Sequence, residues 1–200
     1  MTRIAPPLIL ASASTTRLRV LRDAGFDPEV MVSGVSEDIG DVATARAVVI
    51  LAERKGSAVA GRCPGSLVLG CDSMLDLDGM ALGKPATPEE ATDMWRRLSG
   101  NHGVLHTGHC LIDTRTDRRL CRLASTLVRF GTPSEGEISA YVASGEPLTV
   151  AGAFSIDGLA APFIDSIDGD PSNVLGVSLP LLRRMLDEIG VPITALWRIR

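Results

Sequence analysis

The chain has 200 residues, of which 45% are hydrophobic and 22% are charged, a composition that is typical of a globular protein and excludes extended disorder. Its formal net charge of −4 at pH 7 has the opposite sign to that of a duplex-binding surface, and 4% aromatic residues are too few for a platform that stacks single-stranded bases. We therefore expect no nucleic-acid partner, although a few local cations can still bind a small anionic ligand.

The sequence also argues against a membrane or secreted protein. No apolar run approaches the ~20 residues of a membrane-spanning helix. Residues 1–13 resemble a signal peptide weakly, but Pro6-Pro7 interrupts their apolar part. Four scattered cysteines without a CxxC pair predict reduced, mostly packed thiols and no zinc site. We expect a cytoplasmic protein.

The first quarter of the chain predicts a strand, a polar turn and a helix. Residues 8–11 are apolar and predict a short buried strand, and Ser and Thr residues follow in 12–16. Apolar residues at helical spacing then lead to Gly25, where a helix would end. Residues 26–36 look extended, and the pattern over 44–60 predicts a helix with one charged side.

Strands dominate the middle of the chain. Residues 66–70 predict a second buried strand, and residues 74–77 and 80–82 flank Asp78-Gly79, a strong signal for a tight hairpin. A helix is expected from Thr87 to about Gly100.

The remainder alternates between strands and helices. Residues 103–113 and 119–130 predict two long strands, and a helix is expected over 134–145. Residues 151–167 form a Gly-rich stretch that looks extended, and the last helix is expected over 178–189. The whole pattern predicts one mixed α/β domain over residues 1–200, with a division into two lobes left open.

The turn after the first strand is the first candidate ligand site. Free backbone N–H groups at a helix N-terminus, the hydroxyl of Ser14 and the guanidinium of Arg17 together suit an anion. The alternative is that Ser14 only caps the helix and that Arg17 is solvated. Taken alone, the capping interpretation is the more common one.

Asp72, Lys84 and Glu37 are the other candidates from residue type and place. Asp72 follows a buried strand, where α/β folds place ligands, and can hold a divalent cation or accept a proton from water. Lys84 is fixed between Gly83 and Pro85, which suits phosphate binding. Glu37 can complete a metal site with Asp72. Each has a structural alternative: a polar strand end, an exposed lysine and a solvated acid.

The order of these segments resembles the Maf family of nucleoside triphosphate pyrophosphatases, once called septum-formation proteins. The first block is Leu8-Ile9-Leu10-Ala11-Ser12-Ala13-Ser14-x-x-Arg17, and the third is Leu69-Gly70-x-Asp72-Ser73. Further matching blocks lie at residues 51–55, 82–85, 98–100, 141–148, 151–159 and 172–176. The resemblance covers nearly the whole chain without large gaps.

The resemblance implies a hydrolase acting on acid anhydrides, which cleaves a nucleoside triphosphate between its α- and β-phosphates into the monophosphate and pyrophosphate. It implies a divalent cation, Mg²⁺ or Mn²⁺, a homodimer, and removal of non-standard or surplus nucleotides. The implied α/β fold is an elongated mixed sheet flanked by helices, with two lobes around a cleft, like that of the inosine triphosphate pyrophosphatases.

The resemblance also assigns roles to residues. Ser14, Arg17, Lys55 and Lys84 take phosphate-binding positions, and Asp72 takes that of the catalytic carboxylate. Glu37 takes the position of a loop glutamate near the metal, so Glu37 and Asp72 are the candidate metal ligands. Whether Asp72 acts as a base or as a metal ligand is not separable from sequence.

Two departures leave the substrate open. The family's loop reads Ser-x-Ser-Pro-Arg-Arg, and here Thr15 and Thr16 replace the proline and the first arginine. Asp157 stands where the branch acting on dTTP and UTP has glutamine, whereas the 7-methyl-GTP branch has an acid nearby. Ser73 and Asp157 are therefore candidate specificity residues, with both substrate classes open. The alternative function is a nucleotide-binding regulator of cell division without turnover.

Overall fold

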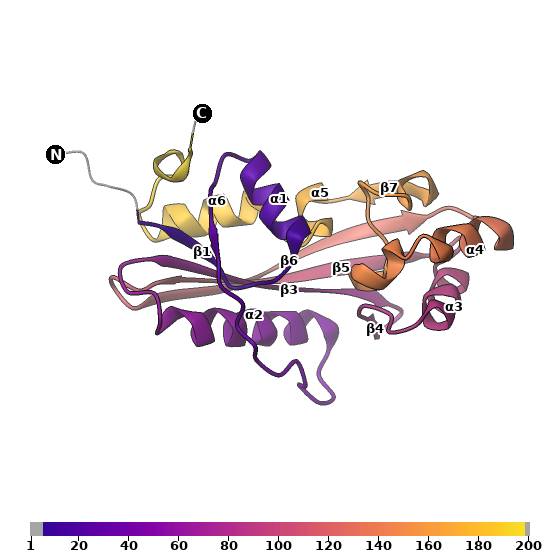
Figure 1. The fold of residues 1–200 in the computed structure, drawn as a ribbon, viewed down its shortest axis with the longest axis horizontal. Coiled ribbons are helices and arrows are strands. Elements are labelled where there is room, and N and C mark those ends of the chain that lie inside the picture. Colours follow the sequence, from indigo (N-terminus) through magenta and orange to yellow (C-terminus); the bar gives the residue numbers. More distant parts are fainter. Residues whose placement is uncertain (1–5, 199–200) are drawn as a thin grey trace.

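The computed structural model describes residues 6–198, so the charged start of the signal-like segment lies outside the described residues. The protein is elongated, with a long mixed sheet as its backbone and helices on both faces (Figure 1). The predicted class, a mixed α/β fold with a sheet flanked by helices, is confirmed.

Within residues 6–198 the sheet has seven strands in the order β2-β1-β3-β5-β6-β7, and β4 pairs with β3 beside this path. Strand β1 is parallel to both of its neighbours, and the other pairs are antiparallel. The strands are β1 (Leu8–Leu10), β2 (Glu29–Val30), β3 (Leu67–Leu77), β4 (Met80–Leu82), β5 (His102–Asp113), β6 (Arg118–Phe130) and β7 (Ile164–Asp168).

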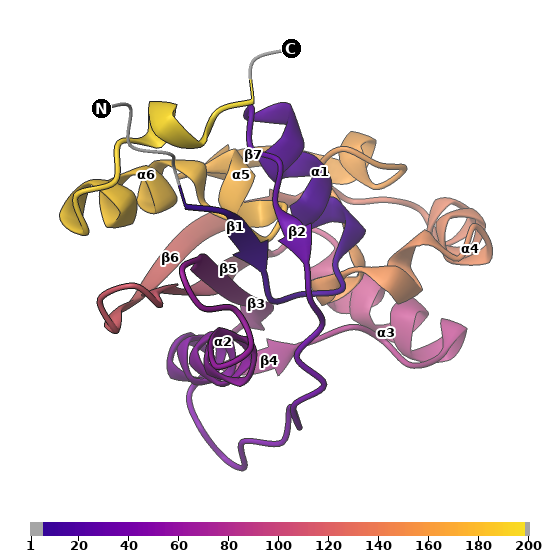
Figure 2. The same ribbon diagram turned by 60° about the vertical axis from the view of Figure 1, so that its left-hand side comes forward.

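Helices cover the sheet unequally. Helix α2 lies along one face, α1, α5 and α6 lie on the other, and α3 and α4 pack together at one end (Figures 1 and 2). In the described part of the chain no helix is long and apolar enough to cross a membrane. The helices are α1 (Thr15–Asp23), α2 (Thr44–Ala60), α3 (Pro88–Leu98), α4 (Glu135–Ala143), α5 (Pro171–Val174) and α6 (Leu179–Glu188), with 3-10 turns η1 (Glu146–Thr149), η2 (Ala151–Ala153), η3 (Ala161–Phe163) and η4 (Ile193–Leu196).

The core follows this layering. One apolar cluster fills the space between the sheet and α1 and α6, and a smaller one lies beneath α2. A third cluster at the end that carries α3 and α4 is built around Trp95, which meets Phe130 and Tyr141 edge to face. The Trp95 indole donates a 2.8 Å hydrogen bond to the Ala153 carbonyl and so fixes the segment after α4.

Most of the predicted elements are present. The helix expected over residues 44–60 is α2, and the two long strands are β5 and β6. Residues 66–70 and 74–77 were expected as separate strands, but they form one unbroken strand, β3. Only Glu29–Val30 is a strand within 26–36.

The extended conformation expected for residues 151–167 is wrong over its first part. That part contains the turns η2 and η3, and the strand β7 begins only at Ile164. Gly152 and Ala153 have φ angles of 68° and 61°, which turn the backbone away from a strand.

Candidate active site

The candidate site lies at a gap along one edge of β3. Strand β1 pairs with β3 up to Leu69, and β4 pairs with it from Leu75 onward. The segment 70–74 has neither partner on that edge. Because β1 is parallel and β4 antiparallel to β3, the C-terminal end of each strand lies next to the gap. The loop after β1 and the segment after β4, which carries Lys84, therefore converge on Asp72 and Ser73.

This placement corrects the expectation for Asp72. The residue was expected at the end of a parallel strand, but β3 continues beyond it to Leu77. What ends near Asp72 is the parallel pairing with β1. Successive strand residues point to opposite faces. The side chains of Asp72 and Ser73 therefore lie on opposite faces of the sheet, both beside the unpaired edge of β3.

Helix α2 approaches the sheet closely enough to bring Lys55 to Asp72. A Cβ atom at Gly70 would overlap the carbonyl of Ala52, and one at Gly108 would overlap the carbonyl of Val48. The two glycines therefore let the helix backbone lie directly on the strands. Lys55, 9% exposed, reaches across this contact to the edge of β3.

Lys55 lies between two carboxylates. Its Nζ is 2.5 Å from Oδ1 of Asp72 and 2.6 Å from Oε1 of Glu37. Asp72 is buried, whereas the side chain of Glu37 is 65% exposed on the loop before α2. The hydrogen bond from Lys55 lowers the pKa of Glu37. The structure thus brings together three predicted site residues from distant segments.

The loop after β1 is organised by Arg17. Ser14 is the N-cap of α1 and accepts from the backbone N–H of Arg17, as the capping alternative predicted. Arg17 itself is 9% exposed, so it is not a solvated helix residue. It donates from Nε to the Gly176 carbonyl at 2.7 Å and from its terminal nitrogens to the hydroxyls of Ser12 and Ser73. Two of its five N–H groups are not used in these bonds.

A chain of two hydroxyls, Ser73 and Thr107, continues from Arg17 to α5. Thr107 donates its hydroxyl proton to the carbonyl of Asn173, 3.1 Å away. The 3.0 Å contact between the hydroxyls of Ser73 and Thr107 therefore has Ser73 as donor, while Ser73 accepts from Arg17. Ser73 thus connects the loop after β1 to α5.

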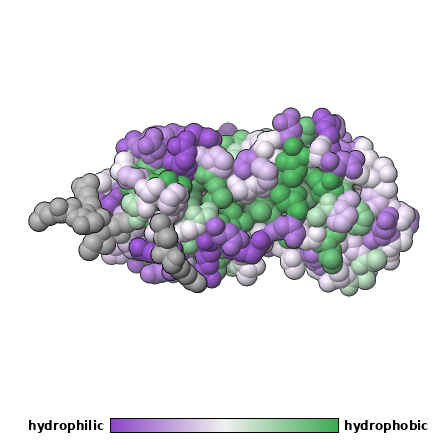
Figure 3. Space-filling view, turned by 90° about the horizontal axis from the view of Figure 1, so that it is seen from above, coloured by the Kyte–Doolittle hydropathy of each residue, from purple (hydrophilic) through white to green (hydrophobic). Residues whose placement is uncertain are grey.

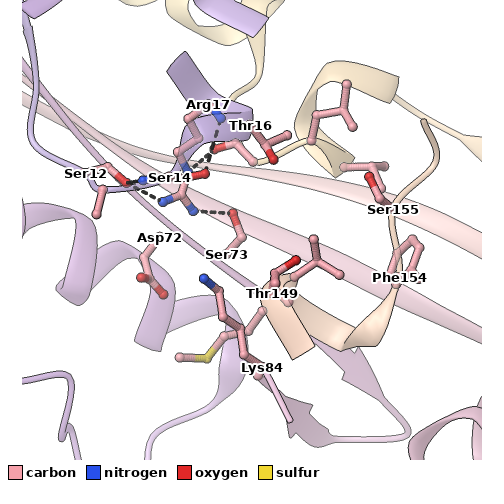
Figure 4. Close-up of a pocket in the computed structure, with 18 of the residues that line it drawn as sticks. Ser12, Ser14, Thr16, Arg17, Asp72, Ser73, Lys84, Thr149, Phe154 and Ser155 are labelled. Atoms are coloured by element: carbon pink, nitrogen blue, oxygen red, sulfur yellow. Dashed lines mark hydrogen bonds between the residues drawn. The ribbon is translucent and has the colours of Figure 1, made fainter. Parts of the chain in front are cut away.

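Lys84 follows β4, and the backbone just before it is hydrogen-bonded to the segment 151–153 beside the cleft. The backbone N–H of Gly152 donates to the carbonyl of Gly83 at 2.8 Å. Gly152 has a φ of 68°, and a Cβ there would lie 2.8 Å from Cβ of Leu75, so the position requires glycine. The Lys84 side chain is exposed and points into the cleft toward Asp72 and Ser73 (Figure 4).

These side chains surround a cleft of about 420 Å³, within the range of small-molecule sites. Charged groups gather at one end, and the opposite end has apolar and hydroxyl side chains (Figure 4). Seen from the side of α1 and α6, apolar surface gathers in the middle of the molecule (Figure 3). The lining includes Ser12, Ser14, Thr16, Arg17, Glu37, Lys55, Asp72, Ser73, Lys84, Thr149, Val150, Phe154, Ser155 and Val174.

Among the described residues, Asp157 is the one predicted site residue outside this lining. Its carboxylate accepts from the guanidinium of Arg19 on α1 and, at 2.5 Å, from the hydroxyl of Ser155. Ser155 does line the cleft, so Asp157 is connected to the site by its hydrogen bond with Ser155.

Cys71 has no role as a nucleophile here. Burial raises the pKa of its thiol to about 12, so it stays protonated. His109 is its direct partner across β3 and β5, but both imidazole nitrogens contact backbone groups, Thr107 O and Ser178 N.

Comparison with known proteins places the chain in a family. The family model described as Maf-like protein matches residues 7–189. The chain belongs to the Maf-like protein family. It is 58% identical over 196 residues to a protein of Streptomyces avermitilis named nucleoside triphosphate pyrophosphatase, covering 96% of this chain and 95% of the relative.

Two further relatives carry the same name. The Streptomyces coelicolor protein is 58% identical over 193 residues, covering 95% of this chain and 94% of its own. The Salinispora tropica protein is 51% identical over 198 residues, covering 95% of this chain and 87% of its own. The resemblance to the family that the sequence motifs indicated is therefore confirmed.

The donor set around Asp72 fits a divalent cation that is shared with a ligand. Within residues 6–198, no group of three or more His, Cys, Asp or Glu side chains could hold a metal ion alone. Glu37 and Asp72 nevertheless converge on one cation, the Lys55 ammonium. Two carboxylates plus phosphate oxygens are a usual environment for Mg²⁺.

Sequence reasoning missed several residues that build this site. Gly70, Gly108 and Gly152 permit the close approaches, and Thr107 and Gly176 receive the contacts of Ser73 and Arg17. A glycine inside a strand is a recognised sign of close backbone approach, so Gly70 and Gly108 carried a usable signal. The other contacts join residues that are distant in the sequence, so no local sequence signal indicated them.

Proposed function

We propose that this protein is a metal-dependent nucleoside triphosphate pyrophosphatase that releases pyrophosphate and a nucleoside monophosphate. The observation that carries the proposal is the convergence of Arg17, Lys55 and Lys84 with the carboxylate of Asp72 on the open edge of β3. The printed names of the relatives support the same activity.

The residues divide the chemistry between them. Ser14, Arg17, Lys55 and Lys84 bind phosphate oxygens, and Lys55 also holds Asp72 through Oδ1. Asp72 then orients or deprotonates the attacking water through Oδ2. The cations stabilise charge that builds up on the phosphate groups during cleavage.

Glu37 and Asp72 would hold the divalent cation, Mg²⁺ or Mn²⁺, with Lys55 moving aside from one carboxylate. When bound, the cation offsets the charge of the phosphate oxygens and lowers the pKa of a bound water. A single domain with two lobes, a homodimer and a cytoplasmic location remain part of the proposal, as does a substrate of either the dTTP/UTP or the 7-methyl-GTP class.

A panel of nucleoside triphosphates tests the proposal. Each is incubated with Mg²⁺, with Mn²⁺ or with a chelator, and pyrophosphate release is measured. We expect release from a subset of bases, and its loss with the chelator. Release that persists in the chelator would remove the metal from the proposal. No release from any nucleotide would refute the enzyme and favour a regulator that only binds nucleotide.

The variant Asp72→Asn separates catalysis from binding. Asparagine keeps the shape of the side chain but cannot accept a proton, so turnover should be lost while nucleotide binding stays close to that of the wild type. Rates equal to those of the wild type would exclude Asp72 from the mechanism.

A further inference from the structure

The turn 157–159 lies behind one wall of the cleft and is held by the carboxylate of Glu146. The backbone N–H of Leu159 donates to both carboxylate oxygens of Glu146, each at 3.0 Å. The hydroxyl of Tyr141 donates to Oε1 at 3.1 Å. A charged acceptor with several donors makes stronger contacts than neutral hydrogen bonds do, so this carboxylate is a firm anchor.

Gly158 shows how closely the carboxylate approaches the turn. A Cβ atom at this position would overlap Oε1 of Glu146 and lie 2.7 Å from Cδ and from Oε2. The φ of Gly158 is not in the left-handed region. Glycine is therefore required here by the contact with Glu146, and not by the backbone conformation.

Glu146 connects two segments of the same wall. It is the first residue of η1, and the end of η1 and the residue after it, Thr149 and Val150, line the cleft. The turn that Glu146 holds follows Phe154 and Ser155, which also line the cleft. Glu146 itself is not among the cleft-lining residues.

The other contacts of the turn are weaker. Leu159 is 59% exposed, so its side chain does not anchor the turn by burial. Asp157 contacts Arg19 on α1, but the Arg19 side chain is 51% exposed, and such pairs contribute little in water. Ile156 and Ala160 pack into the core on either side, and Glu146 fixes the backbone between them.

We propose that Glu146 is a positioning residue that sets the nucleoside-side wall of the cleft and thereby controls affinity for the nucleoside part of the substrate. The inference rests on the proposed function. The cations Arg17, Lys55 and Lys84 occupy the phosphate end, so the nucleoside is left to the opposite end, where the segments held by Glu146 lie.

The test compares a substrate with a ligand that lacks the nucleoside. For Glu146→Ala we expect KM for the best nucleoside triphosphate to rise roughly tenfold or more, with kcat changed by less than about threefold. Inhibition by inorganic tripolyphosphate, which occupies only the phosphate end, should be unchanged. Glu146→Gln should recover most of the affinity, because its amide oxygen can still accept from Leu159.

Gly158→Ala provides a second, independent test. The added methyl group should raise KM in the wild-type background but add little to Glu146→Ala, because its clash partner is then gone. Additive effects of the two changes would overturn the proposal. So would an unchanged KM in Glu146→Ala, or equal weakening of tripolyphosphate and nucleotide.

The same variants keep this inference separate from the proposed function. If the wild-type protein releases pyrophosphate from no nucleotide, the proposed function fails. Equilibrium binding of nucleoside triphosphate and of tripolyphosphate, measured on wild type, Glu146→Ala and Gly158→Ala, still decides the role of Glu146. Parallel loss of both ligands in these variants refutes it, and loss confined to the nucleotide supports it.

Discussion

Acidification below the ordinary pKa of histidine is expected to destabilise the fold through His109. This side chain is fully buried beneath α6. Its Nδ1 lies 3.1 Å from the Thr107 carbonyl, which can only accept, so Nδ1 carries the proton. Its Nε2 accepts from the backbone N–H of Ser178 at 2.8 Å. The fold thus requires the neutral imidazole, and a second proton would break the contact with Ser178.

The size of the effect follows from linkage. Burial lowers the pKa of His109 from 6.5 to about 4. The unfolded chain therefore binds a proton at a pH where the folded protein does not, and stability falls as the pH drops from above 6.5 toward 4. The loss is about 2 kcal/mol at about pH 5, and it approaches about 3 kcal/mol below pH 4.

Urea unfolding of the wild type and of His109→Gln isolates this contribution. Glutamine can accept from Ser178 N but does not titrate. Between about pH 7.5 and about pH 5, the free energy of unfolding of the wild type should fall by about 2 kcal/mol more than that of the variant. Carboxylates titrate in both proteins and cancel in the comparison. Equal losses would refute the assignment of His109 as a buried neutral group.

Three further outcomes are expected from substitutions. Gly108→Ala should lower the free energy of unfolding by more than about 2 kcal/mol, because its methyl group meets the backbone of α2, and urea unfolding measures this. Gly152→Ala should raise KM by displacing the segment that carries Lys84, whereas Gly190→Ala, which has a similar φ but open space, should change stability alone. Arg17→Lys should lower kcat/KM by roughly a hundredfold, because lysine cannot reproduce three directed N–H contacts, and steady-state kinetics measures this.

The elements predicted correctly are those whose apolar residues repeat with the period of the structure they form. Helix α2 and the pair β5 and β6 were found because an amphipathic period and long alternation survive in the folded protein. Strand β3 was divided in two because its central residues, around Asp72, carry no apolar alternation. They are a strand because β5 pairs with them along their whole length, which is a long-range effect.

The turns at 151–163 were missed for a related reason. Ala153 adopts a φ of 61°, which an alanine avoids in isolation. The indole of Trp95 holds its carbonyl, and this contact spans 58 positions of the sequence. No local signal marks such a residue, and backbone in this conformation often borders a functional cleft.

The candidate site was only partly accessible to local reasoning. The residue types of Asp72 and Lys84 suggested chemistry, but Lys55 lies on the charged side of an otherwise ordinary helix. Its role came from the resemblance to the family, and its contact with Asp72 depends on Gly70, which lets α2 reach the sheet.

The charge balance of the cleft bears on the need for a metal. Lys55 is paired with both Glu37 and Asp72, and Arg17 directs three N–H groups to protein atoms. Lys84 is thus the most available cation for a phosphate chain that carries several negative charges. Glu37 and Asp72 would hold the proposed divalent cation, which would add positive charge beside the phosphates. Because Lys55 is paired with two carboxylates, the cleft has less free positive charge than its lysines and arginine imply, and this is the physical reason to expect that pyrophosphate release needs the cation.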